Sequence, residues 1–372
     1  MSSELLDDLR ARDLIFQVAG EDAIDEWLSA EPRTLYCGFD PTADSLHIGS
    51  LVPLLVLRRF QAAGHRPIAL VGGATGLIGD PSFKATERQL NTPEVVADWV
   101  ARIREQVSRF IDFTGDDPAL VVNNLDWMAH VNVLDFLRNI GKHFSVNNMI
   151  GKESVRQRLD REGAGISFTE FSYMILQSFD FAELYHRHGC GLQIGGSDQW
   201  GNITSGIDLI RRRGGEGAHA LTYPLITKSD GTKFGKSASG AIWLDPEKTS
   251  PYAFYQFWLN VEDEKVGELL RIFTFLSREE IEEIEATHAE KPFLRAGQKA
   301  LAEHVTTLVH GAEETARIQA ASAALFGGGD MSTLSADTLG AALGEAGAIA
   351  VERARMPSVT DLLVEAGLAK SK

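Results

Sequence analysis

The sequence has 372 residues, 44% of them hydrophobic and 24% charged, and a formal net charge of −16. Its two cysteines, Cys37 and Cys190, give no disulfide framework and no metal-ligand spacing. The polar N-terminus and the lack of any apolar window approaching eighteen residues argue against a signal peptide and a membrane span. We therefore expect a globular cytoplasmic protein with no membrane partner.

The hydrophobic pattern predicts alternating helices and strands. Residues 1–30 are typical of an amphipathic helix, 34–40 of a strand entering a loop, and 51–63 of a helix that ends at Gly64. Further strands are predicted at 67–71, 120–122, 191–194 and 221–226, and a helix at 168–185. This alternation indicates a doubly wound parallel sheet, in which ligands bind beyond the carboxyl ends of the strands.

The strand pattern ends after about residue 245. Residues 250–325 are mostly helical in pattern, Gly327 to Gly329 form a break, and a new helix begins at Met356. The acidic balance argues against a nucleic-acid partner, yet basic residues gather between Lys142 and Arg161 and at 211–213. Each basic cluster is either a solvated surface or a contact for a polyanion.

Two motifs far apart in the chain suit the same chemistry. Residues 41–50 (Pro-Thr-Ala-Asp-Ser-Leu-His-Ile-Gly-Ser) follow a strand and open a helix, and residues 233–237 read Lys-Phe-Gly-Lys-Ser. Taken singly, each is an ordinary loop, the first capped by Ser50. Together they offer His47, free N–H groups after Gly49, and two lysines around a close backbone approach at Gly235. Such donors and cations stabilise a phosphoryl-transfer transition state.

Two glycine-rich turns follow other strands. The first, residues 72–82, is either a hinge or the support of Asp80, whose carboxylate could hold an ammonium group, with Lys84 and Arg88 as a mobile clamp on pyrophosphate. The second, residues 193–202, places Gly196 and Asp198 where a nucleoside could approach the backbone and donate its ribose hydroxyls.

The helix at 168–185 carries a polar stripe on an apolar element. Tyr173, Gln177 and Asp180 are spaced at i, i+4 and i+7, so they share one face. Buried polar groups need hydrogen-bond partners. Either the stripe is a structural network, or it lines a pocket for a polar aromatic amino acid.

Together these strings resemble the bacterial tyrosyl-tRNA synthetases of class I, most closely between residues 35 and 240. The resemblance implies catalytic roles for Thr42, His47, Lys84, Arg88, Lys233 and Lys236. It implies that tyrosine is bound by Tyr36, Asp80, Asn124, Tyr173, Gln177, Asp180 and Gln193. It implies ATP binding by Gly38, Asp40, Gly49, Ser50, Gly196, Asp198, Gln199, Lys233 and Ser237. The chain departs from the family pattern at Ser50, usually histidine or asparagine, and at Phe83, usually glycine.

The resemblance also implies an organisation and partners. It implies a Rossmann-type catalytic domain at 1–240 with a dimerisation insertion near 125–165, and an all-helical anticodon-binding domain at 245–325. A linker at 326–355 and the start of a truncated C-terminal RNA-binding domain at 356–372 would follow. ATP is the expected co-substrate, with Mg²⁺ carried by ATP and no dedicated protein metal site. The expected partners are L-tyrosine, tRNA(Tyr) and a second copy of the chain.

Three other functions are alternatives to tyrosine–tRNA ligation. A tryptophanyl-tRNA synthetase would not need Tyr36 and Asp180 to hold a phenol. A small-molecule adenylyltransferase also uses a His-x-Gly turn, but such enzymes are usually shorter and lack the helical domain. An RNA-binding protein descended from a synthetase would be expected to lose His47 or the lysine loop, and this sequence has both.

Overall fold

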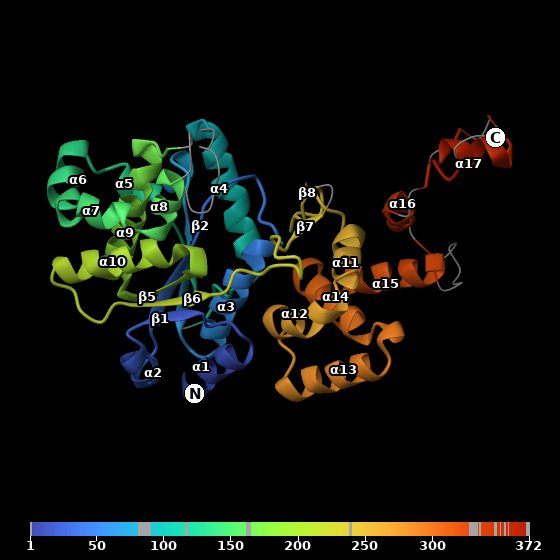
Figure 1. Ribbon diagram of the computed structural model, residues 1–372, viewed down its shortest axis with the longest axis horizontal. Coiled ribbons are helices and arrows are strands. Elements are labelled where there is room, and N and C mark those ends of the chain that lie inside the picture. The colour runs from blue at the N-terminus through green and yellow to red at the C-terminus, as the bar shows by residue number, and fades with distance from the viewer. Residues whose placement is uncertain are drawn as a thin grey trace. The chain divides into compact units, whose positions relative to one another are not determined.

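The computed structural model describes residues 2–80, 91–115, 118–160, 165–237 and 240–326. Beyond these it describes 334, 336–345, 348–349, 351–352, 355 and 357–369. The chain forms two compact units (Figure 1). The first comprises Met1–Lys236 with Arg271–Phe273, and the second comprises Ser237–Leu270 with Thr274–Lys372.

A six-stranded sheet forms the centre of the first unit, in the order β1-β6-β5-β2-β3-β4. The strands are β1 (Gln17–Ala19), β2 (Thr34–Phe39), β3 (Arg66–Val71), β4 (Leu120–Asn123), β5 (Cys190–Gly196) and β6 (His219–Tyr223). All neighbouring pairs from β6 to β4 are parallel, and β1 is antiparallel to β6. The predicted doubly wound α/β sheet is confirmed.

Helices connect the strands on both faces of the sheet (Figure 1). α3 (Leu51–Ala62) joins β2 to β3, α4 (Pro93–Val107) lies between β3 and β4, α9 (Phe168–His188) precedes β5, and α10 (Trp200–Arg212) joins β5 to β6. Short 3-10 turns η1 (Ile48–Ser50), η2 (Thr75–Leu77) and η4 (Ser197–Gln199) follow β2, β3 and β5. The sequence motifs therefore lie where the strands end.

The N-terminal segment is not the single helix that its amphipathic pattern predicts. The structure has α1 (Ser2–Ala11), then the edge strand β1, then α2 (Glu21–Ala30). Asp13 and Gly20 adopt left-handed backbone angles, with φ of 57° and 84°, which end a right-handed helix on each side of β1. Pairing with β6 supplies the backbone hydrogen bonds of β1, a long-range gain that no local pattern shows.

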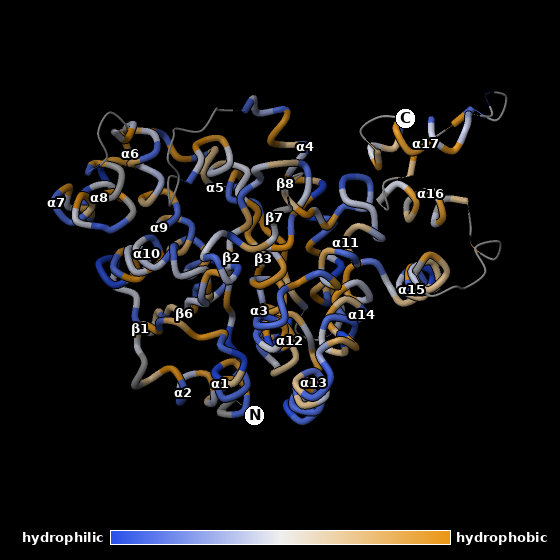
Figure 2. The backbone as a smooth tube through the Cα atoms, turned by 45° about the vertical axis from the view of Figure 1, so that its right-hand side comes forward, coloured by the Kyte–Doolittle hydropathy of each residue, from blue (hydrophilic) through white to orange (hydrophobic). Residues whose placement is uncertain are grey.

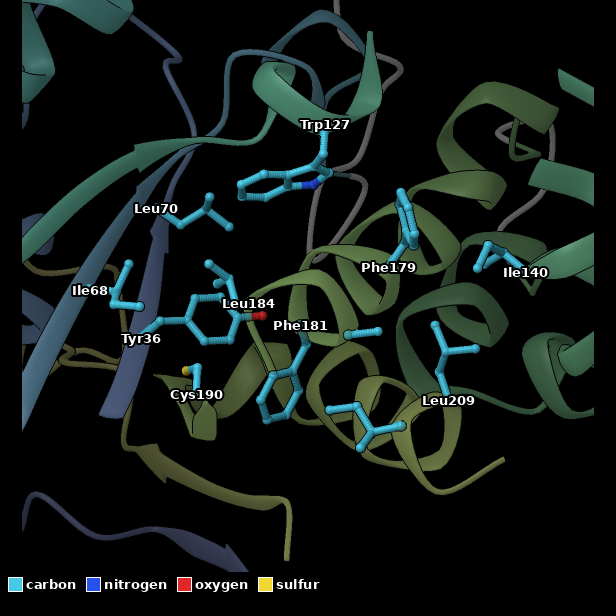
Figure 3. Close-up of a cluster of buried hydrophobic side chains, with 12 residues drawn as sticks. Tyr36, Ile68, Leu70, Trp127, Ile140, Phe179, Phe181, Leu184, Cys190 and Leu209 are labelled. Atoms are coloured by element: carbon cyan, nitrogen blue, oxygen red, sulfur yellow. The ribbon is translucent and has the colours of Figure 1, made fainter. Parts of the chain in front are cut away.

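Between β4 and α9 the chain forms a group of short helices. They are α5 (Leu125–Met128), α6 (Val133–Asn139), η3 (Gly141–His143), α7 (Val146–Ile150) and α8 (Glu153–Leu159). A buried cluster joins this region to the sheet (Figure 3). The cluster includes Leu70, Trp127 and Phe179, and in it Tyr36 packs against Phe181 with ring centroids 5.3 Å apart. The cluster fixes α9 against β2.

The described chain from Lys236 onward, most of which forms the second unit, is helical apart from a two-stranded sheet of β7 (Lys236–Ser237) and β8 (Gly240–Ala241). Its helices are α11 (Pro251–Leu259), η5 (Asp263–Lys265), α12 (Val266–Phe273), α13 (Arg278–Glu290), η6 (Pro292–Leu294), α14 (Ala296–His310), α15 (Ala312–Phe326), α16 (Ala336–Glu345) and α17 (Val359–Glu365). Its core includes the fully buried Phe254 and Trp258 of α11 and Leu301 and Val305 of α14. β3 consists largely of hydrophobic residues, whereas α13 is largely polar (Figure 2). Among the described helices, none is long and apolar enough to span a membrane.

Close packing of α9 and α10 gives a test of the core. A Cβ added at Gly206 in α10 would lie 2.9 Å from Cδ1 and 3.2 Å from Cβ of Phe181. We predict that Gly206→Ala lowers the free energy of unfolding by about 1–3 kcal/mol, because the helices must separate. Thermal unfolding measures this effect. Gly201→Ala in the same helix is the matched control, since its Cβ would meet only Lys152 at an ordinary 3.5 Å. Equal effects of the two substitutions would contradict this description of the packing.

Candidate active site

A cavity of about 300 Å³ opens at the carboxyl ends of β2 and β5. The chain leaves β2 toward β3 and leaves β5 toward β6, so the two connections diverge and leave a crevice at this switch point. Many of the residues predicted to bind tyrosine or ATP line the cavity: Tyr36, Gly38, Asp40, Gly49, Asp80, Tyr173, Gln177, Asp180, Gln193, Gly196, Asp198 and Gln199. They come from β2, η1, α9, β5 and η4 and from the turn after β3.

One end of the cavity holds a buried carboxyl and a buried phenol. Asp180 is 1% exposed, and its two oxygens accept hydrogen bonds from Asn124 Nδ2 at 2.9 Å and Trp127 Nε1 at 2.8 Å. Burial raises the pKa of Asp180 to about 8, although these two hydrogen bonds act in the opposite direction. A carboxyl with this basicity is a strong acceptor for a donated hydrogen.

Tyr36 and Gln193 supply unsatisfied groups beside Asp180. The Tyr36 hydroxyl and the Gln193 Oε1 are buried and have no hydrogen-bond partner among the described residues. Burial and then the charge of Asp180 raise the pKa of Tyr36 well above its ordinary value, so this phenol keeps its proton. Unpaired buried polar atoms are costly, and a polar ligand in the cavity would satisfy them.

A second group of polar side chains lies nearer the mouth of the cavity. The Tyr173 hydroxyl donates to Asp40 Oδ2 at 2.6 Å. Gln199 Nε2 donates to Asp80 Oδ2 at 2.8 Å, and Asn202 Nδ2 donates both to Gln177 Oε1 at 3.0 Å and to Gln199 Oε1 at 3.2 Å. The arrangement gathers carboxylate, amide and phenol oxygens, which are acceptors for a cationic group.

Gly196 and Asp198 lie where β5 ends, together with Tyr223 and Leu225. Burial and the neighbouring charge of Asp80 raise the pKa of Asp198, while Gln199 and the charge of Lys233 lower it. Asp198 is therefore within electrostatic reach of the lysine loop. A carboxylate beside an apolar leucine suits a sugar hydroxyl next to a flat base.

The His47 turn has a defined hydrogen-bond polarity. His47 caps η1, and its Nδ1 accepts the Gly49 backbone N–H at 3.0 Å. Because Nδ1 accepts, the neutral ring carries its hydrogen on Nε2, which can donate to a phosphate oxygen. Ser50 makes no side-chain capping bond to α3, so the plainer interpretation of Ser50 as a helix cap is wrong. Thr42 is exposed, and neither it nor His47 is among the described lining residues.

The lysine loop approaches this turn. A Cβ added at Gly235 would lie 3.4 Å from Cβ of Ile48 and 3.7 Å from the backbone nitrogen of Gly49. Lys233 is exposed, and its backbone forms a bridge with Thr227. Lys84 and Arg88, and the side chains of Lys236 and Ser237, lie outside the described part of the chain. The structure thus brings together two motifs that are 186 residues apart, from His47 to Lys233.

Several residues at the site were not expected from the sequence. Thr75, Cys37, Leu70 and Tyr223 line the cavity, Trp127 holds Asp180, and Asn202 holds Gln177. Asn124, predicted to bind tyrosine, is fully buried and is not among the described lining residues. Asn124 donates a hydrogen bond to Asp180 without lining the cavity. The described residues contain no group of three or more His, Cys, Asp or Glu side chains able to hold a metal ion.

Comparison with known proteins places this site in a family. The family described as tRNA synthetases class I (W and Y) matches residues 28–327. A tyrosine–tRNA ligase of Aliivibrio salmonicida is 60% identical over 372 residues, covering 100% of this chain and 87% of the relative. A tyrosine–tRNA ligase of Acidothermus cellulolyticus is 56% identical over 373 residues, covering the same shares.

Solved structures agree with the sequence comparison. A C-terminally truncated mitochondrial tyrosyl-tRNA synthetase of Aspergillus nidulans superposes with a TM-score of 0.78 at 29% identity, covering 87% of this chain and 94% of that one. A tryptophanyl-tRNA synthetase of Encephalitozoon cuniculi, at 16% identity and a TM-score of 0.59, shares the fold. The chain belongs to the class I tRNA synthetases of the tryptophan and tyrosine group, and within it to the family of the bacterial tyrosine–tRNA ligases.

Proposed function

We propose that the cavity activates L-tyrosine with ATP, giving tyrosyl-adenylate and pyrophosphate, and that the chain then transfers tyrosine to the 3′ end of tRNA(Tyr). The observation that carries this function is the pair of Tyr36 and Asp180 at the inner end of the cavity, with the Tyr36 hydroxyl unpaired among the described residues. An apolar amino acid would leave that hydroxyl buried and unsatisfied. A phenolic hydroxyl can accept from Tyr36 and donate to Asp180.

The acceptor groups near the mouth hold the amino end of the substrate. Asp80, Gln177 and Tyr173 present oxygen atoms to the cavity, and an ammonium group has three N–H donors for them. The distance between the two ends of the cavity then selects an amino acid with a para-hydroxylated ring. The substrate carboxylate is left toward the nucleotide side, near Gly38 and Gly196.

ATP activation is attack of that carboxylate on the α-phosphorus. The carboxylate is already an anion, so the reaction requires placement and charge stabilisation rather than a general base. His47 Nε2 and the lysines of residues 233–237 supply donors and positive charge for the phosphates. Asp198 accepts ribose hydroxyls at the end of β5. Mg²⁺ would arrive with ATP on its phosphate oxygens.

Basic residues outside the cavity suit the tRNA backbone. His143, Lys152 and Arg212 line a second cavity of about 360 Å³ between the insertion and α10. Arg211 and Arg213 are the sequence neighbours of Arg212. Cations grouped in this way bind phosphates even on a chain whose net charge is −16, because screening makes charge a local property. The helical second unit would recognise the anticodon.

The insertion presents an apolar surface that suits a second copy of the chain. Val133, Leu134 and Leu137 of α6 and Val146 and Ile150 of α7 are between 43% and 74% exposed. A concentration of exposed apolar side chains is typical of protein–protein interfaces. The proposed homodimer buries this surface.

The amino-acid specificity is tested by pyrophosphate exchange. We predict that tyrosine drives ATP–pyrophosphate exchange and that phenylalanine and tryptophan do not, following the rule for which tyrosine-specific synthetases are the standard illustration. Asp180→Asn should lower kcat/KM for tyrosine by roughly 10-fold or more, since the amide replaces one of the two acceptor oxygens of the carboxyl by an N–H donor. Exchange driven equally well by phenylalanine would refute the assignment.

The proposed role of His47 concerns rate rather than affinity. His47→Ser keeps an acceptor for the Gly49 N–H but cannot reach a phosphate, so we predict that kcat of exchange falls by about 10²-fold. Tyrosine affinity, measured by calorimetry, should change by less than about 2-fold. A main loss in tyrosine affinity, with kcat retained, would show that His47 acts in binding.

The dimer has a matched pair of tests. Leu134→Glu places a charge on α6, where the side chain is 74% exposed, and should give a monomer in sedimentation because the charge would be buried in the interface. Leu368→Glu alters an equally exposed leucine, at 76%, outside the insertion and should leave the dimer intact. If Leu134→Glu stays dimeric, the interface lies elsewhere.

A further inference from the structure

An ordered chain of hydrogen bonds runs behind the cavity and begins at the backbone. The Ala74 N–H donates to Asn124 Oδ1 at 2.7 Å. This bond fixes the orientation of the fully buried Asn124 amide, so its Nδ2 can only donate. Nδ2 donates to Asp180 Oδ2 at 2.9 Å and to Thr75 Oγ1 at 2.9 Å.

The chain of hydrogen bonds continues through Thr75. Its hydroxyl has a single hydrogen, and because Oγ1 accepts from Asn124, that hydrogen is donated to Asp40 Oδ1 at 2.6 Å. The other oxygen of Asp40 takes the hydrogen of the Tyr173 hydroxyl at 2.6 Å. The Tyr173 oxygen, which lines the cavity, is therefore left as an acceptor.

The backbone leaves space for this bridge and for nothing larger. A Cβ added at Gly72 would lie 2.0 Å from Asp40 Oδ1 and 2.4 Å from Thr75 Oγ1. Thr75 itself is 2% exposed, at the start of η2. The bond between Thr75 and Asp40 thus depends on a residue without a Cβ at the end of β3, which gives a physical reason for Gly72.

We propose that Thr75 is a positioning residue for the amino-acid substrate: its one hydroxyl holds Asp40, which takes the Tyr173 hydrogen and leaves the Tyr173 oxygen to accept from the ammonium group, and through Asn124 it holds Asp180 for the phenol. Both ends of the substrate are then recognised through one chain of hydrogen bonds. This inference rests on the proposed function and deepens it. It does not make Thr75 a catalytic residue, since Thr75 acts through Asp40 and Asn124.

The test compares ligands that differ in one group. L-Tyrosinol carries both the amine and the phenolic hydroxyl. 3-(4-Hydroxyphenyl)propan-1-ol lacks the amine, and L-phenylalaninol lacks the phenolic hydroxyl. Calorimetry with the wild type, Thr75→Val and Thr75→Ser gives two affinity ratios for each protein. One is the contribution of the amine, and the other is that of the phenolic hydroxyl. Thr222→Val is the control, because Thr222 is fully buried in β6 and its hydroxyl donates to the Gln17 carbonyl at 3.4 Å.

We expect both ratios to fall by about 3- to 10-fold in Thr75→Val, the range of one lost neutral hydrogen bond. Thr75→Ser and Thr222→Val should keep both ratios at the wild-type values. Thr75→Ala removes the same hydroxyl and replaces Thr75→Val in the test if that variant does not fold.

Two results would overturn the inference. One is that Thr75→Val keeps both ratios, and the other is that it weakens all three ligands by the same factor, as a merely structural role would. Failure of the proposed function is a separate result. In that case wild-type protein would not bind L-tyrosinol and would show no tyrosine-dependent pyrophosphate exchange, whatever the Thr75 variants do.

Discussion

The site depends on one buried carboxyl, that of Asp180. An ionised carboxylate at 1% exposure is costly unless donors surround it, and Asn124 and Trp127 supply two. Even so, burial raises the pKa of Asp180 to about 8. A further hydrogen-bond donor would favour the ionised form of this carboxyl. In the proposed function the substrate phenol is that donor, and the cost of burying Asp180 becomes specificity.

The sheet topology makes this arrangement possible. Asp180 lies in α9, but its neighbours come from β2 and from the segment after β4 that begins α5. The connections that leave β2 and β5 run in opposite directions, and they bring these segments to the carboxyl edge of the sheet. Tyr36 stands beside Gln193 because the two residues pair in register across β2 and β5. The lysine loop approaches the His47 turn, and these are the two motifs that we propose to bind the phosphates of ATP.

Much of this site could be predicted from the sequence, because its parts lie in short motifs at strand ends. The α9 stripe follows from its spacing, and the five strands β2 to β6 and the helices α3 and α9 follow from periodicity. Other parts depend on long-range geometry. β1 exists through pairing with β6, and Trp127 and Asn202 are recognisable only once α9 is placed against them. Ser50 was a plausible cap, but His47 takes the capping role at η1.

The direction of the hydrogen bonds was also hidden from the sequence. At Asn124 it follows from one backbone donor, the Ala74 N–H, whose position depends on the turn after β3. At Asp40 it follows from a carboxylate that accepts on both oxygens. A crystal structure of the chain with L-tyrosinol tests the central claim most directly. The account predicts the phenolic oxygen within hydrogen-bond distance of both Tyr36 Oη and Asp180. A ligand bound in the reverse direction, or a phenolic oxygen contacting neither group, would contradict it.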